Sequence, residues 1–317
     1  MRIAVFEVED WEREAFESLH NGHQVFFDHE ALTPEHMPEN TEVEAISTFI
    51  YSKATAEVLE RFPNLRLVTT RSTGYDHIDR QHCKERGILL CNVPSYGSNT
   101  VAEHAFALLL NISHKIEEAV DRTRKGDFSS RGLQGFDLFG KTVGVVGTGL
   151  IGQCFIRIAR GFGMHVLAYD VYPNRDAAAT FGFRYVDLDT LYRESDVITF
   201  HVPATPSTRH MVDEETLHKM KRGVILINTA RGDLIDMPAL VRALAEKHVA
   251  AAGLDVLADE PAMREEAELL RRHYNDTHDL ENLLADHVLL RLRNVVVTPH
   301  SALTPHEAVR SILDTTV

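Results

Sequence analysis

The chain has 317 residues, of which 44% are hydrophobic and 25% are charged, and its formal net charge is −14 at pH 7. This length and apolar content are typical of a soluble globular protein with two domains. The acidic balance argues against nucleic acid and anionic membranes as partners, because binding to either needs a basic surface. Any anionic substrate must therefore be held by local cations.

The amino terminus and the cysteines indicate a cytoplasmic protein. Met1–Phe6 has the pattern of a strand rather than of a signal peptide, and no stretch approaches the roughly 20 apolar residues of a membrane span. The three cysteines show no ligand spacing, so we interpret them as reduced thiols. The chain stops at Val317 within a helical pattern that begins near Pro305, and we expect that helix to be truncated.

Strand-like runs alternate with stretches of helical periodicity over most of the chain. The runs are Leu65–Thr70, Thr142–Val146, His165–Tyr169, Val197–Phe200, Val224–Ile227, Ala250–Leu254 and Val295–Thr298. This alternation predicts an α/β fold built from βαβ units around parallel sheets. Between the runs, Asn99 to about Arg124 is expected to form one long helix capped by Asn99, and Arg264–Arg293 one or two surface helices.

A glycine pattern typical of dinucleotide-binding turns follows the second of these runs. Gly147, Gly149 and Gly152 form a GxGxxG arrangement between a strand and a helical run. The first glycine permits a tight turn, the second lets the backbone approach a pyrophosphate, and the third lets the helix pack closely on the strand. Asp170 ends the next strand, where a carboxylate binds the adenosine ribose and repels a 2′-phosphate. NAD is therefore favoured over NADP, although Arg175 lies nearby.

Three polar side chains in the second half follow strand-like runs. Arg231 follows the run that begins at Val224, Glu260 lies shortly after Leu254, and His300 closes the last run. Because the carboxyl ends of parallel strands border the ligand crevice, we expect all three side chains to face the nicotinamide. Taken singly, each has an ordinary alternative as a solvated or hydrogen-bonded surface group.

These three residue types suit the reduction of a 2-oxo acid. A guanidinium binds a carboxylate through two hydrogen bonds. A histidine that is protonated near neutral pH can give a proton to the carbonyl as hydride arrives, and a neighbouring carboxylate favours its charged form and orients it. The pattern predicts an NAD-dependent oxidoreductase acting on a small 2-oxo or 2-hydroxy acid. The 18 histidines lack the ligand spacing of a zinc site, so no metal is expected.

With these motifs, the chain resembles the D-isomer-specific 2-hydroxyacid dehydrogenases over essentially its whole length. The matching stretches are Gly147–Gly152, Ser195–Pro203, Asn228–Gly232, Leu254–Val256 and Thr298–His300. The resemblance implies two Rossmann-like or flavodoxin-like domains with doubly wound parallel sheets and an active site in the cleft between them. Residues 1–98, completed by a carboxyl-terminal helix in 301–317, would form the substrate domain. Residues 99–300 would form the NAD-binding domain.

The resemblance also implies roles for individual residues. Arg231 would bind the substrate carboxylate, His300 would be the acid/base, and Glu260 would orient His300. The implied cofactor contacts are Gly147, Gly149, Leu150, Ile151, Gly152, Asp170, His201, Val202, Pro203, Thr208, Thr229, Ala230 and Asp255. The family further implies a homodimer formed through the NAD-binding domain.

Within the family the chain is most similar to the D-lactate dehydrogenases. The similarity rests on Thr70–Asp79, Asn92–Tyr96 and the long insertion between Glu260 and His300. It implies that backbone amides around Thr73 and Gly74 help to hold the substrate carboxylate and that Tyr96 lines the pocket.

Two departures from the family pattern leave alternatives open. Leu150 stands where many relatives have arginine, and Ser301–Thr304 stands where D-lactate dehydrogenases place an aromatic pair. The first removes a cation near the pyrophosphate, and the second puts a smaller wall beside the substrate. Glyoxylate, hydroxypyruvate and phosphite stay open as substrates, because family members that act on them share the Arg231, Glu260 and His300 set. A protein that senses NAD and acts as a transcriptional co-regulator is an alternative of another class.

Overall fold

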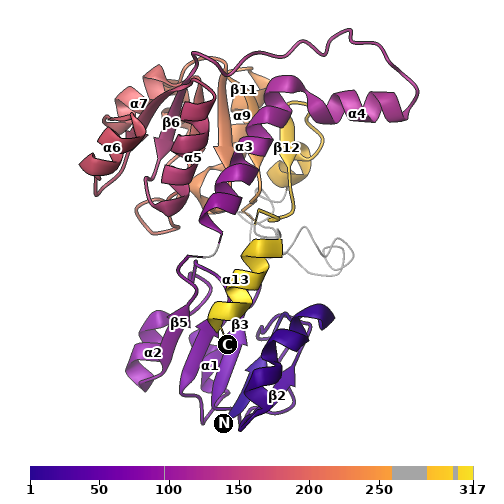
Figure 1. Ribbon diagram of the computed structural model, residues 1–317, viewed down its shortest axis with the longest axis vertical. Coiled ribbons are helices and arrows are strands. Elements are labelled where there is room, and N and C mark those ends of the chain that lie inside the picture. The colour runs from indigo at the N-terminus through magenta and orange to yellow at the C-terminus, as the bar shows by residue number, and fades with distance from the viewer. Residues whose placement is uncertain (96, 259–283, 303–305, 317) are drawn as a thin grey trace. The chain divides into compact units, whose positions relative to one another are not determined.

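The computed structural model describes residues 1–95, 97–258, 284–302 and 306–316. The chain divides into two compact units, each with its own sheet (Figure 1). Unit 1 comprises Met1–Tyr96 and Thr304–Val317, and unit 2 comprises Gly97–Leu303. None of the helices in the described ranges combines the length and hydropathy that crossing a bilayer requires.

Unit 1 is built on a five-stranded parallel sheet with the order β2-β1-β3-β4-β5. Its strands are β1 (Arg2–Val5), β2 (Gln24–Phe27), β3 (Ala45–Thr48), β4 (Leu67–Thr70) and β5 (Leu89–Asn92). Its helical elements are the 3-10 helix η1 (Asp10–His20), α1 (Ala56–Glu60), α2 (Arg80–Arg86) and α13 (His306–Thr316). This strand order is that of the flavodoxin-like sheets.

The carboxyl-terminal helix α13 belongs to unit 1 although it follows the whole of unit 2 in sequence. Its Leu313 lies in one hydrophobic cluster with Ile3 and Val5 of β1 and with Phe16 of η1. Successive residues of a strand point to opposite faces, so Ala4 packs in the cluster on the other face of the sheet. Figure 1 shows α13 in yellow against this sheet.

Unit 2 is built on a seven-stranded parallel sheet with the order β12-β11-β10-β9-β6-β7-β8. Its strands are β6 (Thr142–Val146), β7 (His165–Tyr169), β8 (Arg184–Tyr185), β9 (Val197–Phe200), β10 (Val224–Asn228), β11 (Val249–Leu254) and β12 (Val295–Val297). Six of these strands reproduce the order of a dinucleotide-binding sheet, in which ligands bind where the order reverses. In unit 2 that point lies between β6 and β9.

Helices cover both faces of the sheet in unit 2, as Figure 1 shows. They are α3 (Ser98–His114), α4 (Ile116–Arg124), α5 (Leu150–Gly161), α6 (Arg175–Phe181), α7 (Leu188–Glu194), α8 (Glu214–Lys219), the 3-10 helix η2 (Gly232–Leu234), α9 (Met237–Ala245) and a short helix at residues 284–289. Ile225 and Ile227 of β10 pack in one cluster, and Val224 and Leu226 pack in the other. A strand buried on both faces needs apolar residues throughout, which explains the continuous apolar runs in the sequence.

The predicted α/β class and the seven strand-like runs are confirmed, with differences of one or two residues at some ends. The prediction of one long helix from Asn99 to Arg124 is wrong. The helix α3 starts at Ser98, after the N-cap Gly97, and stops at Lys115, whose φ of 51° is left-handed. Its neighbour α4 begins at once, because the Asn111 side chain accepts a hydrogen bond from the Glu117 N–H at 2.8 Å.

Candidate active site

The glycine turn at the end of β6 has the geometry of a phosphate cradle. Gly147 has a φ of 94°, and a Cβ on it would lie 2.5 Å from the carbonyl oxygen of His201. A Cβ on Gly152 would lie 2.1 Å from the carbonyl oxygen of Gly147, so the helix can pack here only without a side chain. A Cβ on Gly149 would meet no atom within 4 Å.

The amino terminus of α5 is open to a ligand. Gly149 is its N-cap, and no side chain caps it. Helix amino termini attract anions through unpaired N–H groups and a partial positive charge. With the open space at Gly149 and the position between β6 and β9, these residues fit the diphosphate of a dinucleotide. Leu150, the first residue of α5, is 58% exposed and is available to contact one.

Asp170 connects β7 to the glycine turn. One oxygen of its carboxylate accepts hydrogen bonds from the Thr148 N–H at 2.6 Å and from the Thr148 hydroxyl at 2.9 Å. The other accepts from the Tyr172 N–H at 2.9 Å. An ionised carboxylate offers about four acceptor positions, so the half-buried side chain keeps capacity for a further donor such as a ribose hydroxyl.

His201, at the end of β9, is a neutral histidine. Its Nε2 lies 3.1 Å from the Thr199 hydroxyl, and its ring lies 5.4 Å from that of Phe155. Burial of the ring disfavours the charged form and lowers the pKa of His201 to about 3. His201 therefore cannot be the proton donor near neutral pH. In the loop that follows, the Thr208 hydroxyl donates to the carbonyl of Pro203 at 2.7 Å.

Asn228 organises the loop after β10. Its side-chain amide donates to the Arg231 carbonyl at 2.8 Å, and its side-chain oxygen accepts from the Ala230 N–H at 3.1 Å. These bonds turn the chain so that the half-buried Arg231 leaves the strand at the carboxyl edge of the sheet, where its guanidinium donates to the Ala230 carbonyl at 2.8 Å. Thr229 has a buried hydroxyl with no hydrogen-bond partner in the described part of the chain, which a bound cofactor could satisfy.

Asp255 is buried between the ends of β11 and β12. Its carboxylate accepts hydrogen bonds from the Thr298 hydroxyl at 2.5 Å, the Ser301 N–H at 2.9 Å and the Ala302 N–H at 3.0 Å. Burial alone would raise the pKa of the Asp255 carboxyl. The hydrogen bonds from His104, Thr298 and Ser301 outweigh burial and hold this pKa below its ordinary value.

His300 follows β12 in a left-handed conformation, with a φ of 52°. Its backbone N–H donates to the Asp255 carbonyl at 2.9 Å, and the Asp255 N–H donates to the Asn228 carbonyl at 2.9 Å. The segments that contain Arg231 and His300 are thus connected through Asp255 within unit 2. Glu260 lies outside the described residues.

Thr73 and Gly74 lie in the loop after β4 of unit 1. The Thr73 hydroxyl donates to the Val93 carbonyl at 3.1 Å, and the Asn92 side chain donates to the Thr73 carbonyl at 2.8 Å. The Ser72 hydroxyl donates to the Gly74 carbonyl at 2.6 Å. The loop is therefore held between β4 and β5. Tyr96 lies outside the described residues.

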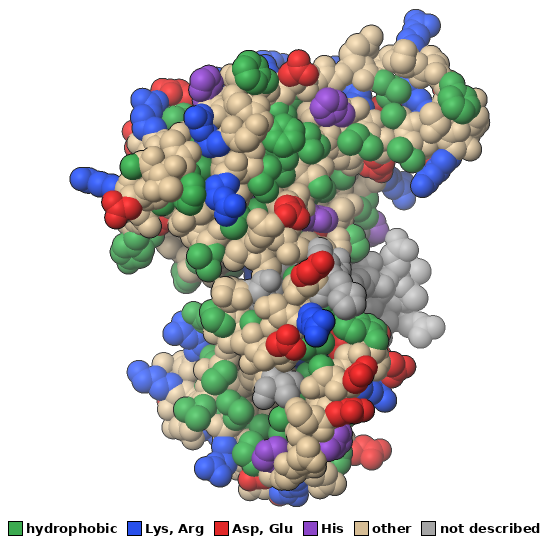
Figure 2. Space-filling view, in the orientation of Figure 1, with side chains coloured by type: hydrophobic (Ala, Val, Ile, Leu, Met, Phe, Trp, Pro, Cys, Tyr) green, Lys and Arg blue, Asp and Glu red, His purple; other side chains and the backbone are tan. Residues whose placement is uncertain are grey.

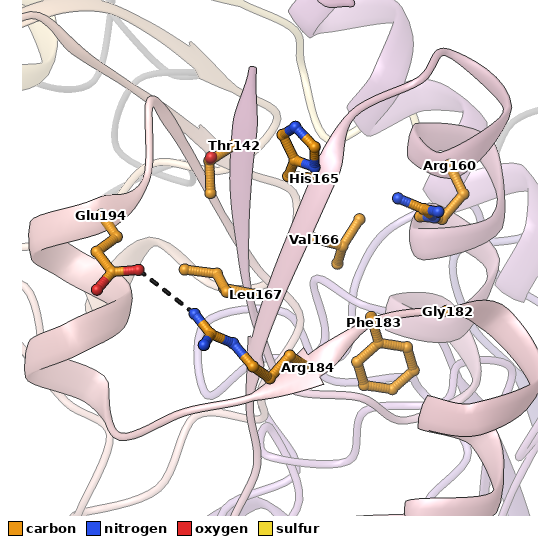
Figure 3. Close-up of a pocket in the computed structure, with 9 residues that line it drawn as sticks. All are labelled: Thr142, Arg160, His165, Val166, Leu167, Gly182, Phe183, Arg184 and Glu194. Carbon is orange, nitrogen blue, oxygen red and sulfur yellow. Dashed lines mark hydrogen bonds and ion pairs between the residues drawn. The ribbon is translucent and has the colours of Figure 1, made fainter. Parts of the chain in front are cut away.

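A cavity of about 420 Å³ lies elsewhere in unit 2 (Figure 3). Thr142 and His165, which begin β6 and β7, line it, whereas the glycine turn lies at the other ends of these strands. Arg184 and Glu194 form an ion pair of 3.5 Å at its rim. The cavity is therefore separate from the candidate site. No group of three His, Cys, Asp or Glu side chains that could hold a metal ion occurs in the ranges that the structure describes.

Two residues of this site were missed by the sequence analysis. Asn228 shapes the Arg231 loop, and His104, on α3, contacts both Asp255 and Thr298. Asn228 stands within a matched motif, so its position offered a signal. His104 offered none, because its partners are far away in sequence.

Comparison with known proteins places these features in one family. A family model described as "D-isomer specific 2-hydroxyacid dehydrogenase, NAD binding domain" matches residues 106–302. A D-lactate dehydrogenase of Escherichia coli (strain K12) is 36% identical over 324 residues, which cover 100% of this chain and 95% of the relative. A hydroxypyruvate reductase of Thermotoga maritima is 38% identical over 288 residues, which cover 89% of this chain and 87% of the relative.

The fold also matches solved structures. A D-lactate dehydrogenase from Aquifex aeolicus, complexed with NAD and lactic acid, superposes with a TM-score of 0.90 at 36% identity. The match covers 99% of this chain and 92% of that one. The whole chain, including both units, therefore has a counterpart in a solved structure.

Proposed function

We propose that this chain, which belongs to the D-isomer-specific 2-hydroxyacid dehydrogenase family, interconverts pyruvate and D-lactate. Membership of the family makes the protein an NAD-dependent oxidoreductase acting on the CH–OH group of donors. The observation that supports the proposal most is the link between the His300 turn, Asp255 and the Arg231 loop at the carboxyl edge of one sheet. The nicotinamide, when bound, supplies the hydride for reduction and accepts it in oxidation.

Side chains of unit 2 would bind the substrate and transfer the proton. Arg231 binds the substrate carboxylate through its guanidinium. His300 gives a proton to the carbonyl oxygen of the 2-oxo acid and takes it back in the reverse direction. Glu260 orients the imidazole of His300 and favours its charged form. The neutral His201 contributes position rather than a proton, because its pKa is too low.

The cofactor would be held along the carboxyl ends of β6, β7, β9 and β10. The amides of the glycine turn receive the diphosphate, and Asp170 accepts hydrogen bonds from the adenosine ribose. The remaining contacts proposed for the cofactor are Leu150, Ile151, His201, Val202, Pro203, Thr208, Thr229, Ala230 and Asp255. The open face of Gly149 and the unpartnered hydroxyl of Thr229 support this placement.

Unit 1 would be the substrate domain. The backbone amides at Thr73 and Gly74 would help to hold the substrate carboxylate, and Tyr96 would line the pocket. The anchoring of their loop between β4 and β5 supports this role, since it fixes the two amides. We expect the two units to close on the substrate and to exclude water from the hydride path.

The share of this chain that each relative matches differs between the candidate substrates. The D-lactate dehydrogenase of Escherichia coli matches 100% of this chain in sequence, and that of Aquifex aeolicus matches 99% of it in structure. A relative named glyoxylate reductase matches 83% of the chain and one named hydroxypyruvate reductase matches 89%. Of pyruvate, glyoxylate and hydroxypyruvate, pyruvate is thus the substrate whose named relatives match this chain over its full length.

A substrate panel tests the proposal. Initial rates are measured with NADH and with NADPH for pyruvate, glyoxylate and hydroxypyruvate, and phosphite is tested with NAD. The proposal predicts the highest kcat/KM for pyruvate with NADH. A higher value for another 2-oxo acid or for phosphite would assign that activity instead. Tight NADH binding without turnover of any of them would favour the NAD-sensing co-regulator.

We also propose that the protein is a cytoplasmic homodimer joined through unit 2. The helix α4 and the segment after it form an arm that extends from unit 2 in Figure 1, and α4 has no buried residue. Val120 and Phe128 of the arm are 40% and 84% exposed, and Figure 2 shows hydrophobic side chains there. Apolar side chains on such a projection favour a protein partner. Light scattering should give the mass of two chains at micromolar concentration. In the Phe128→Asp variant, the measured mass should fall toward that of one chain.

A further inference from the structure

We propose that His104 is a positioning residue: from α3 it holds the buried carboxylate of Asp255, and through Asp255 it fixes the turn that contains His300. This inference rests on the proposed function of His300 as the acid/base. It adds to the site a side chain from α3, a helix that lies outside the matching stretches on which the family resemblance rests.

The contact geometry of His104 requires a hydrogen on Nε2. This atom lies 3.2 Å from Oδ1 of Asp255 and 3.0 Å from the hydroxyl oxygen of Thr298. The hydroxyl hydrogen of Thr298 is directed to Asp255, so both atoms that face Nε2 are acceptors. His104 therefore donates its Nε2–H between them.

The site of this contact is shielded from water. The Asp255 side chain is 0% exposed and that of His104 is 22% exposed. The charge of a buried carboxylate must be stabilised by donors, because it has lost its hydration. Within the described part of the chain Asp255 has four of them: the Nε2–H of His104, the Thr298 hydroxyl and the N–H groups of Ser301 and Ala302.

Three of these donors lie on the two sides of His300 in the sequence. Thr298 precedes it, Ser301 and Ala302 follow it, and its own N–H is held by the Asp255 carbonyl. A left-handed φ of 52° is uncommon for a residue other than glycine and persists where surrounding contacts impose it. Asp255, through its carboxylate and its backbone carbonyl, is the common partner of those contacts.

His104 is the member of this network that comes from outside the β11 and β12 loops. It lies on α3, which packs against both strands, so its ring holds the carboxylate from the helix side. Without the Nε2–H, Asp255 loses one of its four donors among the described residues, and the Thr298 hydroxyl loses the hydrogen bond that it accepts from His104. The turn then becomes free to relax, and the imidazole of His300 loses its fixed direction.

The test compares two substitutions at this position. His104→Gln keeps an N–H donor at about the same reach, whereas His104→Leu keeps only bulk. The control is His114→Leu, which removes an exposed histidine from the last turn of the same helix. We expect kcat for pyruvate reduction to fall about 10–100-fold in His104→Leu, the usual effect of a misplaced reacting group. His104→Gln and His114→Leu should stay within about three-fold of the wild type.

Comparing the change in kcat with the changes in KM and Kd distinguishes a loss of positioning from a general loss of structure. The KM for pyruvate should change little in His104→Leu because Arg231 is untouched, and the Kd for NADH should change less than kcat does, because the glycine turn and Asp170 are untouched and only the contact of Asp255 is disturbed. A kcat near the wild-type value in His104→Leu would overturn the proposal, and so would equal losses in the Gln and Leu variants. If His104→Leu does not fold, Thr298→Val replaces it, because valine keeps the shape and removes the bridging hydroxyl; a wild-type kcat there would overturn the proposal.

A second readout does not depend on turnover. In protein labelled with ¹⁵N-histidine, the ring signals of His300 are assigned by their loss in His300→Asn. These signals should move in His104→Leu and stay in place in His104→Gln. Unchanged signals in both variants would contradict the positioning role. This result decides the inference even where the wild type turns over no 2-oxo acid, which would refute the proposed function alone.

Discussion

The backbone N–H of His300 donates to the backbone carbonyl of Asp255 across 2.9 Å. This bond places the predicted acid/base beside a buried carboxylate that also accepts the N–H groups of Ser301 and Ala302. Asp255 is thus a structural centre of the site in addition to its predicted contact with the cofactor. In the positioning role proposed above, the contacts of Asp255 set the direction of the His300 side chain.

Replacing Asp170 with Ala should weaken the preference for NAD. The ribose hydrogen bonds to a carboxylate are charge-assisted, worth about 1.5–3 kcal/mol each, and its charge repels a 2′-phosphate. The ratio of kcat/KM with NADH to that with NADPH should fall about ten-fold or more. Thr148→Val is the matched control, since it removes one contact of Asp170 and leaves the carboxylate. An unchanged ratio in Asp170→Ala would show that this side chain does not face the ribose.

Alanine at Gly149 and at Gly152 should have different effects. At Gly149 the new Cβ meets no protein atom within 4 Å, so stability should hold while NADH binding weakens, by about ten-fold. At Gly152 the Cβ would lie 2.1 Å from a backbone oxygen, so the free energy of unfolding should fall by about 1–3 kcal/mol. Urea unfolding and NADH fluorescence titration measure both. Equal loss of stability in the two variants would contradict an open cradle at Gly149.

His201 should make the protein less stable in acid. Its pKa is about 3 in the folded state and has an ordinary value of about 6.5 in the unfolded chain. Below pH 6.5 the unfolded state therefore binds a proton that the folded state does not, and stability falls with pH down to about pH 3. From pH 7 to pH 5 this group should remove about 2 kcal/mol from the free energy of unfolding.

The variant His201→Gln tests this origin of acid sensitivity. It should lose about 2 kcal/mol less than the wild type between pH 7 and pH 5 in urea unfolding. Thr199→Val keeps the buried ring and removes the hydroxyl near its Nε2, so it should retain the wild-type pH dependence. Parallel curves for the wild type and His201→Gln would show that the ring is solvated.

Replacing Glu260 with Gln should move the pH dependence of reduction. The carboxylate, if paired with His300, favours the charged imidazole, and Gln keeps its shape without its charge. The pH limb of pyruvate reduction should shift to lower pH, and reduction at neutral pH should slow more than lactate oxidation does. Equal losses in both directions with no shift of the limb would mean that Glu260 only packs against its loop.

The strands and the glycine turn could be predicted because their physical requirements are local. Strands buried on both faces need unbroken apolar runs such as Val224–Ile227, and β10 follows that run to within one residue. Gly147 has a φ of 94°, which residues other than glycine rarely adopt. The glycine in the sequence pattern therefore indicated a tight turn at this position.

The break at Lys115 and the role of His104 could not be predicted because they depend on distant or context-dependent contacts. Lysine is a good helix former, and a stop there is favoured by contacts such as the hydrogen bond that the Asn111 side chain accepts from the Glu117 N–H in the first turn of the next helix. His104 lies on an amphipathic helix, where a histidine at the edge of the apolar face has no special signal. Its partner Thr298 is 194 residues away.

The dependence of both reaction directions on pH tests the central claim most directly, namely that His300 is the acid/base. Steady-state rates of pyruvate reduction and D-lactate oxidation are measured across pH 5 to 10 for the wild type and for His300→Ala. Reduction should need the protonated imidazole and oxidation the neutral one, so the two limbs should run in opposite directions around one ionisation. His300→Ala should lower both rates about 10²–10⁴-fold and abolish the limbs, while the Kd for NADH stays nearly constant. Limbs that run in the same direction, or a His300→Ala variant that keeps the wild-type rate and limb, would contradict the account.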